Sequence, residues 1–342
     1  MLSRPERAVV DHGGSLARAR TLFPDAPEPL VDLSTGISPH PYPFSTLPAT
    51  AYRRLPEPAR EAELRSVAAR AYGAPSADCL VAAPGTQILL PLIAGLMKPG
   101  RVAICGPTYA EHAAAAALCG HAVTEIEDHA DAGSADIVTM VNPNNPDGRL
   151  TTRSALLSLR AALRSRGGML VVDEAFMDVG PVEQSVAADV EDGGLVVLRS
   201  FGKFHGLAGI RLGFVIANVA IAARLRRLLG PWAVSGPALE IGIEALNDVR
   251  WGEAARARLQ SDSARLDALL SHHGIQVSGG TSLFRFVRSP DAPALFRALG
   301  TAGVIVRHFV ERPNDLRIGL PGVEAEWERL AAALASWRKK AA

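Results

Sequence analysis

Residues 137–173 read IVTMVNPNNPDGRLTTRSALLSLRAALRSRGGMLVVD, a stretch whose pattern predicts one complete strand–helix–strand unit. The apolar runs at 137–141 and 170–172 predict two buried strands, and the spacing of leucine and alanine over 152–166 predicts an amphipathic helix between them. Short buried strands that alternate with helices are typical of a parallel sheet. This unit therefore predicts an α/β fold.

The same alternation continues on both sides of this unit. Further apolar runs, which we expect to be strands, occupy Cys79–Ala82, Val102–Cys105, Leu195–Leu198 and Gly213–Ile216. The alanine-rich stretch Tyr109–Leu118 and the stretch Gln87–Met97 are expected to be helices. Together they predict a large, doubly wound and mostly parallel sheet domain over residues 46–230.

The two ends of the chain have different patterns. Residues 1–45 are rich in proline and glycine and predict an ordered arm that contributes to a small domain and to the site. From residue 231 a helical pattern over 238–270 is followed by short apolar runs at 282–287, 304–306 and 316–318. Residues 231–342 are therefore expected to form a smaller α+β domain.

Composition favours a small-molecule partner. The 342 residues include 36 Lys and Arg against 35 Asp and Glu, so a formal charge of +1 gives no reason to expect binding of nucleic acid or of an anionic membrane. Three cysteines without metal-ligand spacing predict reduced thiols and no metal site. The charged, proline-containing N-terminus and the absence of a long uninterrupted apolar run predict a cytoplasmic protein without a membrane span.

Polar residues follow the expected strands, and in open α/β sheets ligands bind at those strand ends. Lys203 lies in a small, apolar setting after the run 195–198, which can make an amine nucleophilic; a solvated surface lysine is the alternative. Ser200 and Arg211 could grip a phosphate while the lysine bonds an aldehyde. Gly85 and Thr86, before the helix expected from Gln87, could add an anion site at a helix N-terminus; a plain capped turn is the alternative.

Three further positions fit a phosphate-bearing aromatic cofactor. Asp173 ends an apolar strand and needs a cation, which a protonated ring nitrogen would supply, unless it merely caps a helix. Tyr109 could stack on the ring or be a core aromatic. Asn145 could donate to a ring oxygen or serve only the proline-rich turn around it. In the smaller domain, Arg307 and Arg317 could each bind a carboxylate or phosphate, with surface ion pairing as the alternative.

Three motifs, NPNNPDG at 142–148, DEAF at 173–176 and SFGKFHGLAGIRLG at 200–213, resemble the class I/II aminotransferase family in order and spacing. These are fold-type I enzymes that use pyridoxal 5'-phosphate (PLP), and the resemblance covers nearly the whole chain. It implies a homodimer in which Lys203 bonds covalently to PLP, Asp173 pairs with the ring nitrogen, Asn145 bonds the ring oxygen and Tyr109 stacks.

The resemblance also implies the remaining binding residues. The cofactor phosphate would be held by Gly85, Thr86, Ser200 and Arg211. Arg317 matches an arginine that binds the substrate carboxylate, and Arg307 matches one found where the substrate carries a phosphate. Phe176 stands where many relatives have a tyrosine, which leaves Asn145 a larger share of the contact with the ring oxygen. Leu55 stands where an interface tyrosine is common, and the nearby Tyr52 could replace it.

The N-terminal arm resembles one branch of this family. His12-Gly13-Gly14 and Asp32–Pro39 are similar to the threonine-phosphate decarboxylases of cobalamin biosynthesis, with histidinol-phosphate aminotransferases as the nearest relatives. This implies decarboxylation of L-threonine O-3-phosphate to (R)-1-aminopropan-2-ol O-phosphate, with His12, Gly36 and Asn145 as further substrate contacts. A histidinol-phosphate-type aminotransferase is the main alternative.

Two other classes of protein remain open from the residues. Ser200 and Lys203 satisfy the Ser-x-x-Lys pattern of acyl-serine hydrolases, although no Ser-Asp-Asn or Lys-Thr-Gly follows. A catalytically idle interaction domain could keep the fold without binding PLP. Such a protein would leave the absorbance spectrum of added PLP unchanged.

Overall fold

The computed structural model describes residues 13–341 and divides the chain into two compact units. The first unit comprises the chain up to Gly36 together with 264–279 and 284–342, and the second comprises 37–263 and 280–283. The sequence pattern predicted boundaries at 45/46 and 230/231 instead. Helix α10 (Val249–His272) begins in the second unit and ends in the first, so the change of unit falls inside a continuous helix that no turn signal marks.

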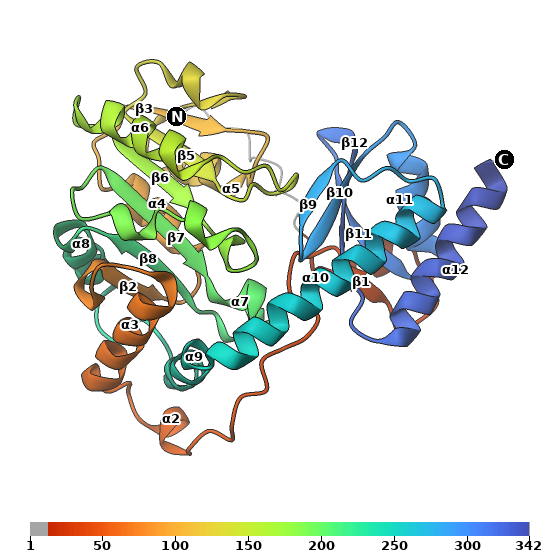
Figure 1. Cartoon of the computed structure of the whole chain (residues 1–342), viewed down its shortest axis with the longest axis horizontal. Helices are drawn as coiled ribbons and strands as arrows, with labels where there is room; N and C mark the ends of the chain where they lie inside the picture. The colour runs from red at the N-terminus through yellow and green to blue at the C-terminus, as the bar shows by residue number, and fades with distance from the viewer. Residues whose placement is uncertain (1–12, 342) are drawn as a thin grey trace, which may run out of the picture. The chain divides into compact units, whose positions relative to one another are not determined.

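The second unit is built on a seven-stranded sheet with the order β2-β8-β7-β6-β5-β3-β4 (Figure 1). The pairs β3–β4, β3–β5, β5–β6 and β6–β7 are parallel, whereas β8 runs antiparallel to both β7 and β2. The predicted, mostly parallel sheet is therefore confirmed. The strands are β2 (Leu80–Ala83), β3 (Arg101–Cys105), β4 (Ala122–Ile126), β5 (Ile137–Val141), β6 (Met169–Asp173), β7 (Leu195–Ser200) and β8 (Gly213–Ala217).

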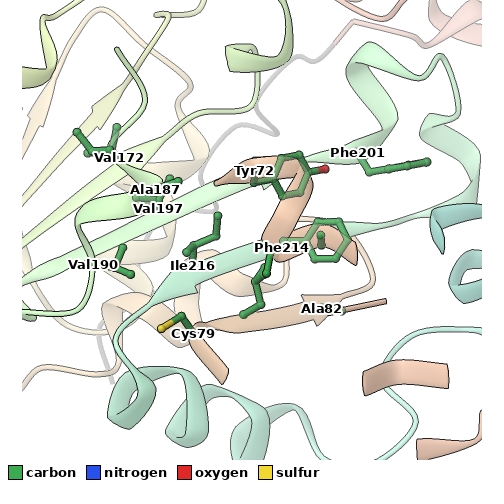
Figure 2. Close-up of a cluster of buried hydrophobic side chains, with 14 of the residues drawn as sticks. Tyr72, Cys79, Ala82, Val172, Ala187, Val190, Val197, Phe201, Phe214 and Ile216 are labelled. Atoms are coloured by element: carbon green, nitrogen blue, oxygen red, sulfur yellow. The ribbon is translucent and has the colours of Figure 1, made fainter. Parts of the chain in front are cut away.

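Helices cover both faces of this sheet. Successive residues of β6 alternate between two cores: Leu170 and Val172 face one, and Met169 and Val171 face the other. Figure 2 shows part of the first core, around Phe201 and Phe214. The helices of this unit are α2 (Thr50–Arg53), α3 (Pro58–Tyr72), α4 (Leu89–Ala94), α5 (Glu111–Leu118), α6 (Arg153–Arg164), α7 (Phe201–Phe204), α8 (Val219–Leu229) and α9 (Gly236–Asn247).

Local sequence sets the helix ends. Helix α3 begins with Pro58, whose missing N–H is not needed in the first turn, and stops at Gly73 in the left-handed conformation (φ 68°). Helix α6 begins after Thr152, whose side chain accepts a hydrogen bond from the N–H of Ala155. The buried faces of these two helices carry Leu64 and Leu156, which belong to the same core. The apolar pattern and the caps thus act together.

The first unit contains four strands of a five-stranded sheet with the order β1-β11-β12-β10-β9, whose edge strand β9 continues into the second unit at residue 280. Strand β1 lies parallel to β11, and β12 is antiparallel to both β11 and β10. Its strands are β1 (Val31–Leu33), β9 (Gly279–Thr281), β10 (Phe284–Arg288), β11 (Val304–Phe309) and β12 (Arg312–Gly319), and its other helices are α1 (Leu16–Leu22), α11 (Ala292–Thr301) and α12 (Glu324–Ala341). Within residues 13–341, no helix has the length and apolar character needed to cross a membrane.

Candidate active site

A cavity of about 160 Å³ lies in the second unit at the carboxyl ends of the central strands β5, β6 and β7. It brings together eight side chains or glycines that the sequence proposed for cofactor binding. These are Gly85, Thr86, Tyr109, Asn145, Asp173, Ser200, Lys203 and Arg211. The carboxyl ends of parallel strands gather these residues from distant parts of the chain.

Lys203 stands on the one-turn helix α7, which directly follows the last residue of β7, Ser200. Its side-chain nitrogen lies 5.8 Å from the ring centre of Phe176, and Phe176 is 2% exposed. The amine is therefore presented to the cavity beside an aromatic wall. An amine in such a partly desolvated position is suited to attack a carbonyl group.

Asp173 ends β6 and is 5% exposed. One carboxylate oxygen, Oδ1, accepts a hydrogen bond from the N–H of Ala175 (3.0 Å), and Oδ2 lies 2.9 Å from Nε2 of His112. Sequence reasoning missed His112, which lies on α5 among alanines and is itself buried. The available signal was its position three residues after Tyr109, which places both on one face of an expected helix.

Tyr109 is held at the cavity wall by a chain of hydrogen bonds. Its hydroxyl donates to Oε1 of Gln87 (3.0 Å), and Nε2 of Gln87 donates to Oε2 of Glu111 (2.8 Å). Burial first, and then the charge of Glu111, raises the pKa of Tyr109 to about 12. The phenol is therefore neutral at physiological pH, and its ring packs edge-on against His112 at 5.9 Å.

Asn145 lines the cavity from a loop whose other asparagines fix its shape. Asn142 and Thr151 exchange two hydrogen bonds of 3.0 and 2.8 Å, and the Thr108 hydroxyl donates to Asn144 (2.7 Å). Because Asn142 and Asn144 hold the loop, Asn145 is presented to the cavity. The hydrogen bonds that stabilise the turn, which were the alternative role for Asn145, are thus made by Asn142 and Asn144.

Gly85 and Arg211 approach each other closely in the lining of the cavity. Gly85 has φ +84°, and a Cβ there would lie 2.6 Å from Nη2 of Arg211, so glycine permits this approach. Arg211 itself has φ +55°, and Trp232 is the other non-glycine residue with positive φ in the described part of the chain. Uncommon backbone conformations of this kind cluster at functional sites.

The helix expected from Gln87 begins only at Leu89 and has six residues. Gly85 and Thr86 therefore lie in the turn before α4 and not at its first residues, which corrects the prediction of a helix N-terminus there. The turn is closed by hydrogen bonds from the N–H of Gly85 to Ala83 (2.7 Å) and from the N–H of Leu89 to Thr86 (3.0 Å). Both residues still line the cavity.

The first unit holds the candidate substrate arginines. Arg307 on β11 and Arg317 on β12 are paired across the two strands. Arg317 is 8% exposed and donates through Nη2 to the carbonyl of Ser34 (2.9 Å). Burial, and next the charge of Arg307, lowers the pKa of Arg317 to about 10. Two neighbouring guanidinium groups favour an anionic ligand, because it relieves their mutual repulsion.

Gly36, another predicted substrate contact, belongs to the same unit, whereas Asn145 belongs to the second unit. Gly36 is buried and follows β1 by three residues. Arg307 lines a second cavity with Gly14 and Ser34, where the N–H of Gly14 donates to the Ser34 hydroxyl (2.7 Å) and this hydroxyl donates to Asp32 (2.6 Å). His12 lies outside the described residues.

The donor set of the cavity around Lys203 fits PLP. An arginine, two hydroxyls and a glycine that makes room for the guanidinium suit a phosphate. A buried carboxylate at the end of β6 suits a protonated pyridine nitrogen, and a lysine amine suits the aldehyde. The arrangement is that of an enzyme that handles amino acids through such a cofactor.

The chain belongs to the aminotransferase class I and II family, whose profile matches residues 49–334. Its relatives include the threonine-phosphate decarboxylase of Pseudomonas aeruginosa, 41% identical over 97% of this chain and 99% of that protein. The threonine-phosphate decarboxylase of a Sinorhizobium species is 42% identical over 96% of this chain and 98% of its own length. Membership of this family of PLP-dependent enzymes speaks against the acyl-serine alternative.

Solved structures share the fold. Histidinol-phosphate aminotransferase from Sinorhizobium meliloti, determined in complex with PLP, has a TM-score of 0.80 at 19% identity and covers 96% of this chain and 95% of its own. L-threonine-O-3-phosphate decarboxylase from Porphyromonas gingivalis has a TM-score of 0.75 at 23% identity and covers 91% of this chain and 100% of its own. The predicted fold-type I architecture is thereby confirmed.

Proposed function

We propose that this protein is a PLP-dependent decarboxylase that converts L-threonine O-3-phosphate to (R)-1-aminopropan-2-ol O-phosphate and carbon dioxide in cobalamin biosynthesis. The observation that carries the proposal is the identity of 41–42% to two threonine-phosphate decarboxylases, over 96% of the chain or more. Two histidinol-phosphate aminotransferases match at 29% and 32%. The site residues described above fit the cofactor of both activities.

The roles of the cavity residues follow from their chemistry. Lys203 would hold the cofactor aldehyde, and Asp173 would keep a proton on the ring nitrogen, with His112 orienting the carboxylate through its 2.9 Å contact. When bound, PLP supplies an electron-accepting ring that weakens whichever bond to the α-carbon lies perpendicular to it. Tyr109 and Asn145 would fix the plane of that ring.

The outcome of the reaction depends on how the substrate is held. A decarboxylase must turn the carboxylate of the amino acid out of the ring plane, whereas an aminotransferase exposes the Cα–H bond. In this proposal Arg307 and Arg317 bind the two anionic ends of threonine phosphate, assisted by His12 and Gly36. Two fixed guanidinium groups can enforce such an orientation because each makes paired hydrogen bonds.

We further propose a homodimer. Tyr52, Leu55 and Trp232 are 68%, 63% and 53% exposed, so three large apolar side chains are open to water in two nearby segments. Their segments are neighbours, because Gly236 packs against the backbone of Ala51. A second copy of the chain would cover this surface, and Tyr52 is the candidate to reach the partner's site. A cytoplasmic location is in keeping with Cys79, Cys105 and Cys119, none of which forms a disulfide.

The test uses purified protein, PLP and L-threonine O-3-phosphate, without any 2-oxo acid. We expect carbon dioxide and the amino-alcohol phosphate in equal amounts, and no release from L-threonine, which lacks the phosphate. Turnover that requires 2-oxoglutarate would establish the aminotransferase instead. The variant Lys203→Ala serves as the control and should release no carbon dioxide above the background.

A further inference from the structure

The helix that carries Lys203 is only four residues long. One helical turn is not stable alone, because nucleation costs more than its few hydrogen bonds return. Its carbonyls are satisfied from outside the turn: the N–H of Ser38 donates to Lys203 (2.8 Å), and the N–H of Tyr42 donates to His205 (2.9 Å). The position of Lys203 is therefore set by neighbouring segments.

His205 closes this turn with its side chain. Both its backbone N–H (3.4 Å) and its ring nitrogen Nδ1 (3.1 Å) donate to the carbonyl of Phe201, the first residue of α7. Since a carbonyl can only accept, the hydrogen bond assigns the proton to Nδ1. His205 is 4% exposed, so this bond is shielded from competing water.

The ring of His205 is also stacked between two aromatic faces. It lies parallel to Phe201 at 4.0 Å and to Trp251 of helix α10 at 5.5 Å, with interplanar angles of 10° and 12°. The edges of Tyr42 and Phe204 complete the surroundings at 6.4 and 5.1 Å. Stacked aromatic pairs contribute beyond their buried area, so the ring joins α7 to two other segments.

The segment 38–42 approaches α7 closely at Gly206. This glycine has φ +65°, and a Cβ on it would lie 2.8 Å from both Cα of Pro41 and the carbonyl oxygen of Ser38. Glycine therefore allows the segment to lie directly against the end of the helix, where its two N–H groups reach the carbonyls.

We propose that His205 is a positioning residue for Lys203, and that its stacked and hydrogen-bonded ring holds the helical turn from which the amine reaches the cofactor cavity. The inference rests on the proposed function only in taking Lys203 as the residue that holds PLP. Lys203 and Gly202 line the cavity, whereas His205 is not among the described residues that do so. Its effect must therefore pass through α7.

Three variants separate the two contributions of the ring. His205→Phe keeps the stack and removes the bond from Nδ1, His205→Asn keeps a donor and removes the ring, and His205→Ala removes both. The matched control is His121→Ala. His121 is also buried (6% exposed) and is bonded on both ring nitrogens, to Gly100 and Ala94, away from α7.

Two measurements report on Lys203, and melting temperature reports on the fold. The first is the dissociation constant of PLP, from titration of the visible absorbance band. The second is the labelling of Lys203 by an amine reagent in the PLP-free protein, relative to the exposed Lys98, by mass spectrometry. For His205→Ala we expect about tenfold weaker PLP binding. The ratio of Lys203 labelling to Lys98 labelling should move closer to one, because Lys203 would then react more like an exposed lysine. For His205→Phe and His205→Asn, the PLP affinity and the labelling ratio should each lie between those of His205→Ala and those of the parent protein.

His121→Ala should lower the melting temperature and leave PLP binding and labelling within about twofold of the parent protein. The proposal is overturned if folded His205→Ala matches the parent in both measurements, or if His121→Ala changes them as much. If His205→Ala does not fold, unchanged values in both His205→Phe and His205→Asn overturn it. If the parent binds PLP but releases no carbon dioxide, only the proposed function fails. If it binds no PLP, the labelling ratio alone decides on His205.

Discussion

Asp173 and His112 form a buried pair behind the cavity, and each residue is 5% exposed. A carboxylate in such a place is retained only with partners, which here are the N–H of Ala175 and the imidazole. A carboxylate can accept more hydrogen bonds than these two. Its remaining capacity as an acceptor suits a protonated ring nitrogen.

Removing the charge of Asp173 should abolish most of the turnover without preventing PLP from binding. For Asp173→Asn we expect carbon dioxide release to fall by at least about 100-fold, since the amide cannot hold the proton on the cofactor ring. PLP should still bind through Lys203 and the phosphate contacts. Initial rates and the visible absorbance band test both statements, and a variant with near-normal turnover would exclude this role for Asp173.

Gly85→Ala tests the contact between the glycine turn and Arg211. The added Cβ would displace the guanidinium, which lies 2.6 Å from its position, so we expect about tenfold weaker PLP binding. Gly73→Ala is a matched control, because Gly73 also has positive φ (+68°) but a Cβ on it would meet no atom within 4 Å. Both variants should lose similar stability, about 1 kcal/mol. Equal PLP affinities in the two variants would contradict the proposed phosphate site.

The central strands could be predicted from the sequence because they are buried on both faces. The runs at 137–141 and 195–198 are continuous apolar stretches, and the structure has strands there. Strand β4 was missed because this edge strand, Ala122–Ile126, is largely exposed and mixes polar with apolar residues. The antiparallel direction of β8 has no local signal, since it depends on how the chain returns to the sheet.

The site residues and the helix boundaries could likewise be predicted only in part from the sequence. The sequence motifs named Lys203, Asp173 and Asn145, which line one cavity. His112 was missed because a single buried histidine in an alanine-rich helix looks like core. The pattern over 238–270 predicted helical structure without marking a break. The structure has α9 and α10 separated at Asp248, whose side chain accepts a hydrogen bond from the N–H of Trp251 (3.0 Å).

The stability of the folded protein should depend on pH through His205, which follows the last residue of the helix that carries Lys203. Burial lowers the pKa of His205; the charge of Asp178 and the hydrogen bond to Phe201 oppose this shift, and the charge of Arg256 adds to it. Below about pH 6.5, the usual pKa of histidine, the unfolded chain gains a proton that the folded protein resists, so stability falls as pH falls. The melting temperature of the parent should therefore drop more between pH 7.5 and 5.5 than that of His205→Phe. Equal decreases in the melting temperatures of the two proteins would contradict the attribution of this pH dependence to His205.

The two units supply different parts of the proposed chemistry. The seven-stranded unit gathers the residues for PLP, and the five-stranded unit carries the paired arginines for the substrate anions. The residues proposed for PLP lie at strand ends and in the turns and the short helix between elements, and the two arginines lie on neighbouring strands. Fixed positions of this kind are what selection of one bond among several requires. Matches over nearly the full length of two relatives show that both units have counterparts in those proteins.

The exposed apolar surface around Trp232 predicts a dimer of two 36.1 kDa chains. Trp232→Arg should weaken this dimer, because a charge would have to be buried at the interface. Leu118→Arg is the control, since Leu118 is 80% exposed on α5 outside this surface. Sedimentation velocity over a range of concentrations measures the change. A monomeric parent protein, or equal dissociation of both variants, would contradict the proposed interface.

The most direct measurement is to locate the residue that holds PLP. The chain has four lysines, Lys98, Lys203, Lys339 and Lys340, so borohydride reduction of the PLP-loaded protein followed by peptide mass spectrometry can distinguish them. We predict one label per chain, on Lys203, with carbon dioxide release lost in proportion to labelling. A label on another lysine, or full turnover by Lys203→Ala, would contradict the account.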